Sequence, residues 1–186
     1  MTDSDATVLV VDDDEDLADT FEVWLEQAGY EALTAYGGDE ALARFDPEMD
    51  VVLLDRRMPH VPGDEVLREL REREGDQQVS MLTAVEPQAD VLDLPFDEYL
   101  TKPVSRQDLL DAVERLRDRQ SLDAEMQELF RLTSKLGALE AGTSEDVAAA
   151  RDELESRIEE QEARVDEYLQ EFDDHAEAFA VLQETE

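Results

Sequence analysis

The sequence contains no cysteine, and only two of its 186 residues are lysines, Lys102 and Lys135. The missing cysteines exclude disulfide bonds, thiolate metal sites and cysteine nucleophiles. Aromatic residues make up 6% of the chain, and no apolar run approaches the ~20 residues that a membrane span requires. The first residues are neither basic nor apolar, so no signal peptide is predicted. We therefore expect a cytoplasmic protein without a membrane partner.

Positive charge is also scarce. The chain has 52 acidic residues against 16 basic ones, which gives a formal net charge of −36. Such a field repels polyanions, so the composition argues against a nucleic-acid binder that neutralises phosphates. Heavy acidity with few lysines and few aromatics is typical of a protein that works in molar salt, where the Debye length is about 3 Å. An ordinary acidic mesophilic protein is the alternative. Hydrophobic residues, 41% of the chain, suffice for a core.

Apolar runs alternate with amphipathic segments along the first part of the chain. The runs at 8–11 and 51–54 are wholly apolar and rich in branched residues, which indicates buried strands of a parallel sheet. Further strands are predicted at 30–36, 79–83 and 98–101, with helices between them and one capped by Ser105. The sequence therefore predicts the α/β class, with a doubly wound, five-stranded parallel sheet.

Polar side chains stand where the predicted strands end. They are Asp12 and Asp13 after the first strand, Asp55 after the third, Thr83 at the end of the fourth and Lys102 after the fifth. Carboxyl ends of parallel strands share one edge of the sheet, so these groups should converge. Carboxylates without histidine or cysteine suit a hard divalent ion, best Mg²⁺. A carboxylate beside Mg²⁺ can accept a phosphoryl group, with Lys102 and Thr83 contacting the phosphoryl oxygens.

Four ordered motifs resemble those of a response-regulator receiver domain. They are Val-Leu-Val-Val-Asp-Asp-Asp at 8–14, Leu-Leu-Asp-Arg-Arg-Met-Pro-His-Val-Pro-Gly at 53–63, Met-Leu-Thr-Ala at 81–84 and Tyr-Leu-Thr-Lys-Pro at 99–103. Their spacing resembles that of the family from about residue 7 to residue 118. The resemblance implies a CheY-like, flavodoxin-like fold in which Asp55 is phosphorylated by a sensor histidine kinase.

The resemblance also implies a role for each residue at the sheet edge. The implied ligands of Mg²⁺ are Asp12, Asp13, Asp55 and the backbone carbonyl of Arg57. Lys102 and Thr83 are implied to contact the phosphoryl group, and Tyr99 to be an aromatic switch that swings inward when Thr83 moves. The Lys102–Pro103 peptide is implied to be cis.

The chain departs from the family between Thr83 and Lys102, where it is shorter by a few residues. Residues 84–90 are poor helix formers, so we expect the fourth helix to be a stub or irregular. In the family that helix helps to form the face on which activated receivers dimerise. The departure therefore argues against that mode of pairing here.

The composition changes near Ser121, so we divide the chain into a receiver at 1–119 and a helical output domain at 120–186. Seam positions alternate at spacings of four and three residues, which predicts coiled-coil packing. They are Leu122, Met126, Leu129, Thr133, Leu136, Val147, Arg151, Leu154, Ile158, Gln161, Val165, Tyr168, Phe172, His175, Phe179 and Leu182. One arrangement is a continuous helix from Ser105 to Glu140 with the last helix folded back along it; a two-chain coiled coil also fits. The tail resembles the HalX domain attached to receivers in haloarchaea.

Three functions compete. The first is a phosphorylation-controlled signalling switch, not an enzyme, whose tail acts by protein–protein contact, as a homodimer or on a transcription-related partner. The second is a transcription regulator that touches DNA directly. Against it, residues 121–186 hold 5 basic and 20 acidic residues and show no basic recognition helix. The third is a metal-dependent phosphatase with Asp55 as nucleophile, for which no substrate pocket or second general acid is evident.

Overall fold

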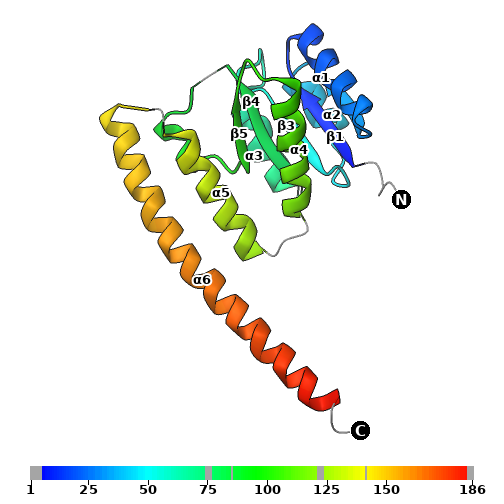
Figure 1. Ribbon diagram of the computed structural model, residues 1–186. Coiled ribbons are helices and arrows are strands. Elements are labelled where there is room, and N and C mark those ends of the chain that lie inside the picture. Colours follow the sequence, from blue (N-terminus) through cyan, green and yellow to red (C-terminus); the bar gives the residue numbers. More distant parts are fainter. Residues whose placement is uncertain (1–5, 74–76, 85, 121–123, 141, 184–186) are drawn as a thin grey trace.

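The computed structural model of the chain has an α/β domain followed by two further helices (Figure 1). It describes residues 6–73, 77–84, 86–120, 124–140 and 142–183, and of residues 168–183 the backbone alone. The strands are β1 (Thr7–Val11), β2 (Glu31–Ala35), β3 (Val51–Leu54), β4 (Gln78–Thr83) and β5 (Glu98–Thr101). The helices are α1 (Glu15–Gln27), α2 (Gly38–Arg44), α3 (Gly63–Glu72), the 3₁₀ helix η1 (Ala89–Asp93), α4 (Arg106–Gln120), α5 (Ala124–Ala138) and α6 (Glu145–Gln183).

Within the described residues, five strands form one parallel sheet in the order β2-β1-β3-β4-β5. This confirms the predicted doubly wound α/β class. β1 lies between β2 and β3, so the direction of winding reverses beside β1. In sheets of this kind the functional crevice opens at that reversal, beyond the carboxyl ends of the strands.

Side chains of β1 alternate between two apolar layers, as the pleat requires. Val8 and Val10 face the layer formed with α1 and α4. Leu9 and Val11 face the layer formed with α2, α3 and η1, which continues into the tail. The expected short or irregular fourth helix is confirmed, because η1 is a single 3₁₀ segment.

The prediction of one continuous helix from Ser105 to Glu140 is wrong. α4 ends at Gln120 and α5 begins at Ala124, with 121–123 outside the described residues. Arg119 Nη1 lies 3.4 Å from Ser134 Oγ, whereas a continuous helix would separate these positions by about 22 Å. The chain therefore turns back after α4. The folding back of the last helix is confirmed, since α6 packs beside α5 and then continues past it (Figure 1).

The predicted α6 seam is confirmed at positions such as Val147, Leu154, Gln161 and Val165, which are buried. The seam positions from Tyr168 onward, and Leu122, lie outside the described side chains. Among the described helices, none combines the length and the hydropathy that crossing a bilayer demands.

The predicted α5 seam is only partly correct. Thr133, a predicted seam position, is exposed, and the buried side chains of α5 are Leu132 and Lys135. Leu132 belongs to the apolar layer shared with the sheet, and Lys135 donates a hydrogen bond to the Leu92 carbonyl of η1. The most buried stripe of α5 therefore faces the α/β domain, while α6 covers a neighbouring stripe.

Candidate functional site

Three carboxylates converge beyond the carboxyl ends of β1 and β3. Asp12 is 2% exposed and Asp55 8%, whereas Asp13 is open to solvent. One oxygen from each of the three lies within 4.8 Å of one from each of the others. Carboxylates this close repel one another unless a cation stands among them.

Lys102 supplies a positive charge to this cluster. It follows β5, where its backbone N–H donates to the Thr83 carbonyl at 2.8 Å. Its ammonium forms an ion pair with Asp12, and Nζ lies 3.1 Å from Asp55 Oδ2. Burial lowers the pKa of Lys102, but its bonds to the two carboxylates outweigh burial, so the pKa lies above the ordinary value. The ammonium thus stays charged between Asp12 and Asp55.

The pKa of Asp12 is raised, mainly because burial disfavours its charged form. The Lys102 ammonium and the backbone N–H of Asp14, 3.0 Å from Asp12 Oδ1, oppose that rise. Asp14 itself caps α1, since its side chain accepts a hydrogen bond from the Leu17 N–H. Asp12 and Asp13 therefore belong to the carboxylate cluster, whereas Asp14 caps α1.

Thr83 is the last residue of β4, and Tyr99 lies inside the neighbouring strand β5. Thr83 is buried at the end of β4, beside the strand that leads to Asp55. Tyr99 is half-buried in β5, with its ring 5.5 Å from that of Phe96 in an edge-on arrangement. Burial raises the pKa of Tyr99, and the neighbouring Arg56 guanidinium opposes this. The structure thus brings Tyr99 next to Arg56.

The turn after Asp55 is tightly packed. Arg57 N–H donates to Asp55 Oδ1 at 3.3 Å, and Gly63 N–H donates to the Arg56 carbonyl at 2.9 Å. A Cβ on Gly63 would lie 2.1 Å from the Asp55 carbonyl oxygen. Only glycine fits there, because α3 starts directly against the backbone of Asp55. The Lys102–Pro103 peptide is cis, as expected.

Arg56 is buried beside this turn. Its Nε lies 3.0 Å from Asp64 Oδ1 in α3, and its Nη2 binds Asp90 in η1. Burial opposes the charge of Arg56, but these two carboxylates hold its pKa above the ordinary value. Pro62 precedes the first residue of α3, and Asp64 lies in the first turn of the helix, where its carboxylate binds Arg56.

Sequence reasoning missed the residues that hold the tail to the α/β domain. Buried Asp97, just before β5, accepts hydrogen bonds from Arg71 of α3 at 2.5 Å and from Arg131 of α5 at 2.9 Å. Lys135 of α5 reaches the Leu92 carbonyl of η1 at 2.9 Å. The one signal in the sequence was that Lys135 is one of two lysines.

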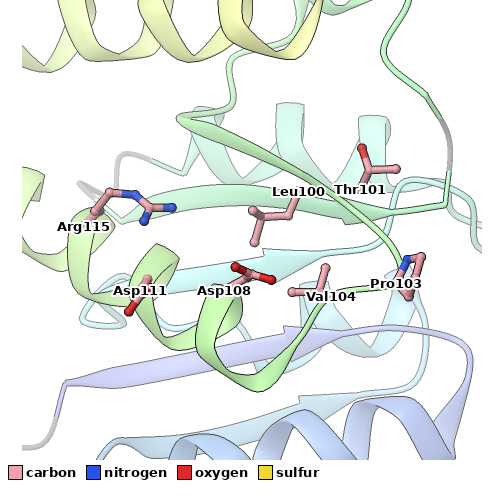
Figure 2. Close-up of a pocket in the computed structure, with 7 residues that line it drawn as sticks. All are labelled: Leu100, Thr101, Pro103, Val104, Asp108, Asp111 and Arg115. Atoms are coloured by element: carbon pink, nitrogen blue, oxygen red, sulfur yellow. The ribbon is translucent and has the colours of Figure 1, made fainter. Parts of the chain in front are cut away.

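Three of the open pockets on the described chain adjoin the turn after Asp55, the tail and α4. One of about 510 Å³ adjoins the turn after Asp55 and is lined by residues such as Arg56, Arg57 and Asp90. One of about 400 Å³ lies between the domain and the tail, with Tyr99 on one side and Gly137 of α5 on the other. Figure 2 shows the third, of about 290 Å³, between β5 and α4. No tail residue lines this third pocket in the described chain, so it stays open beside Pro103.

Family comparisons divide the chain in two. The response regulator receiver domain family matches residues 8–114, and the HalX domain family matches residues 118–182. A Haloferax volcanii protein whose name proposes a transcriptional regulator is 49% identical over 158 residues, 84% of this chain and 27% of that protein. The Bacillus subtilis alkaline phosphatase synthesis transcriptional regulatory protein PhoP is 34% identical over 126 residues, 66% of this chain and 52% of PhoP. The chain thus spans about a quarter and about half of these relatives.

Solved structures match the α/β part. A CheY-like receiver domain from Methanospirillum hungatei is 29% identical with a TM-score of 0.59, covering 63% of this chain and 97% of that one. The Thermotoga maritima response regulator TrrA, solved with Mg²⁺ and beryllofluoride, is 33% identical with a TM-score of 0.54, covering 59% and 97%. Sheet order, site position and family match agree: the chain belongs to the response regulator receiver family and carries a HalX domain behind its receiver.

Proposed function

We propose that the chain is a two-component response regulator that a sensor histidine kinase phosphorylates on Asp55. The observation that carries the proposal is the grouping of Asp12, Asp13 and Asp55 within 4.8 Å, with the Lys102 ammonium between two of them. A carboxylate oxygen of Asp55 attacks the phosphorus of a phosphohistidine, the P–N bond breaks, and imidazole leaves. The family works in the cytoplasm, and we propose the same compartment.

The donor set at this edge suits Mg²⁺, since carboxylate and carbonyl oxygens are the ligands this ion prefers. Asp12, Asp13, Asp55 and the Arg57 carbonyl would hold it. When bound, the ion offsets the repulsion between the phosphoryl oxygens and the carboxylates. Lys102 then binds a phosphoryl oxygen and exchanges part of its contact with Asp55 for it.

Thr83 and Tyr99 change position when Asp55 is phosphorylated. The Thr83 hydroxyl donates a hydrogen bond to a phosphoryl oxygen, and Tyr99 moves into the space that Thr83 leaves. The phosphoryl group carries about −1.5 to −2 charges in place of the single negative charge of the Asp55 carboxylate, enough to reorganise neighbouring polar contacts. Tyr99 borders the pocket against α5, so its movement reaches the tail directly.

We propose that the output domain, residues 120–186, signals by protein–protein contact, as a homodimer or on a transcription-related partner. α6 continues past α5, so the far part of α6 does not pack on α5 and is free for such a contact (Figure 1). The names of both curated relatives speak of transcriptional regulation, and the alternative for this chain is direct DNA contact by the tail. The acidity of residues 121–186 argues against it.

Phosphotransfer from a radiolabelled histidine kinase tests the assignment, in molar KCl with Mg²⁺. Wild-type protein should be labelled, and Asp55→Asn should not, with unchanged circular dichroism. Asp50→Asn is the matched control, because Asp50 lies directly before β3, at the opposite end of that strand from Asp55, and its carboxylate accepts a hydrogen bond from the Thr7 N–H. Labelling of Asp55→Asn at another residue would contradict the proposal. Mass by light scattering, with and without beryllofluoride, then separates a dimer from a docking surface for another protein.

A further inference from the structure

The tail rests on two elements of the receiver, and both are tied to the residue that follows Asp55. Asp90 belongs to η1 and Tyr99 to β5, and Arg56 lies against both side chains. Arg56 is 9% exposed, so solvent does not compete freely for its guanidinium. Its third partner, Asp64, anchors it to α3.

The far sides of these same elements carry the tail. η1 contacts α6, and its Leu92 carbonyl accepts the hydrogen bond from Lys135 of α5. β5 contacts α5, and Asp97 at its start binds Arg131 of α5. Val91 and Leu94 share an apolar layer with tail residues such as Leu154. A shift of η1 or β5 therefore changes the surface on which the tail sits.

From this arrangement we propose that Arg56 is the positioning residue that couples the state of Asp55 to the docking of the HalX tail. The proposal rests on the proposed function, because the state in question is phosphorylation. A new dianion one residue away competes with Asp90 for the guanidinium. When the Arg56–Asp90 ion pair breaks, η1 is no longer bound to the residue next to Asp55, and the tail packs less tightly on the receiver.

The coupling works in both directions. Whatever changes tail docking through Arg56 changes the affinity of the site for a phosphoryl analogue by the same factor. A lysine at this position could hold one carboxylate but not two at fixed geometry, because an ammonium is a point charge without the planar fork of arginine. Arg56→Lys should therefore keep only part of the coupling that Arg56→Gln removes.

The experiment measures hydrogen exchange of α5 amides in the full chain in molar KCl, with and without Mg²⁺ and beryllofluoride. Calorimetry measures beryllofluoride binding to each variant separately. In the wild type, beryllofluoride should speed the hydrogen exchange of α5 amides about tenfold. This is the effect expected when one charge-assisted hydrogen bond that holds the tail docked, that of Arg56 with Asp90, is lost. Arg56→Gln and Asp90→Asn should exchange about that fast already and respond little further, with Arg56→Lys between them.

Arg44→Gln is the matched control, since Arg44 pairs with Glu40 on the exposed surface of α2. It should behave as the wild type does. Asp90→Asn removes the same ion pair but keeps Arg56, so this variant tests the coupling even if Arg56→Gln fails to fold. Binding of beryllofluoride with an equal response of α5 in wild type, Arg56→Gln and Asp90→Asn overturns the coupling and leaves the proposed function standing. Absence of binding to the wild type overturns both.

Discussion

Raising the pH should tighten the tail on the receiver, because Lys135 is buried at their interface with few partners. The residue is 4% exposed. Nζ donates a hydrogen bond to the Leu92 carbonyl at 2.9 Å and lies 5.5 Å from the centre of the Phe96 ring. Burial lowers the pKa of Lys135 to about 8, and repulsion from Arg157 and Arg131 adds to this. Glu128 and Asp93 oppose the shift without cancelling it.

The sign of the effect follows from proton binding. In an undocked tail the pKa of Lys135 returns toward 10.5, so between pH 8 and 10.5 the undocked state holds more protons than the docked one. Stability rises with pH wherever the less ordered state binds more protons. At about 1.4 kcal/mol per pKa unit, the buried ammonium opposes docking by about 3 kcal/mol at pH 7. That penalty disappears gradually above pH 8.

Denaturant unfolding between about pH 7 and 9.5 in molar KCl, with hydrogen exchange of α5, measures the effect. Wild-type stability should climb across this range. Lys135→Met should be more stable at pH 7 by about 1–2 kcal/mol, less than the full penalty because the Leu92 carbonyl loses its donor. Its stability should show no climb. Arg106→Met, which removes one charge from an exposed position of α4, is the control. A wild-type stability that stays flat or falls, or an equal slope in Lys135→Met, refutes the reasoning.

Further predictions concern packing, the site turn and salt. Leu132→Ala should cost about 2–4 kcal/mol in unfolding free energy by leaving a cavity under the tail, while Val23→Ala, on an exposed face, should cost little; equal losses would contradict the interface. Gly63→Ala should weaken beryllofluoride binding and lower the melting temperature, because its Cβ would strike the Asp55 carbonyl. Gly137→Ala, with open space around it, should instead gain about 0.5–1 kcal/mol. Lowering KCl from about 3 M to about 0.2 M should lower the melting temperature, since the Debye length lengthens and the charge of −36 repels itself.

The sequence was informative wherever short-range patterning decides structure. The apolar runs at 8–11 and 51–54 form buried strands. A strand that helices cover on both faces needs apolar side chains on both faces, so its sequence is apolar throughout. The acids after them had to meet, because parallel strands end at one edge. Convergence of Asp12, Asp13 and Asp55 was predictable for that reason, and the structure bears it out. Their chemical roles remain a prediction for the phosphotransfer experiment.

The tail was harder to predict, because periodicity reports which face of a helix is apolar and not where the helix turns. Between Pro103 and Gly137 the chain has no proline or glycine to mark a break. The only signal near the end of α4 was therefore the change of composition near Ser121, and a continuous helix fitted the periodicity equally well. Burial of Lys135 could not be foreseen either, since lysines are almost never fully buried unless a tertiary contact places them there.

The position of the tail bears on how the protein can signal. β5 is an edge strand, and uncovered edges invite pairing with other chains. Here α5 packs against β5 and α6 packs against η1, so the docked tail covers this edge of the receiver. Another chain can therefore reach this edge only when the tail is undocked. If phosphorylation releases the tail, it frees both this surface and the buried stripe of α5 with Leu132 at the same moment. Inhibition and output would then use one interface, and the Arg56–Asp90 contact would set the balance between them.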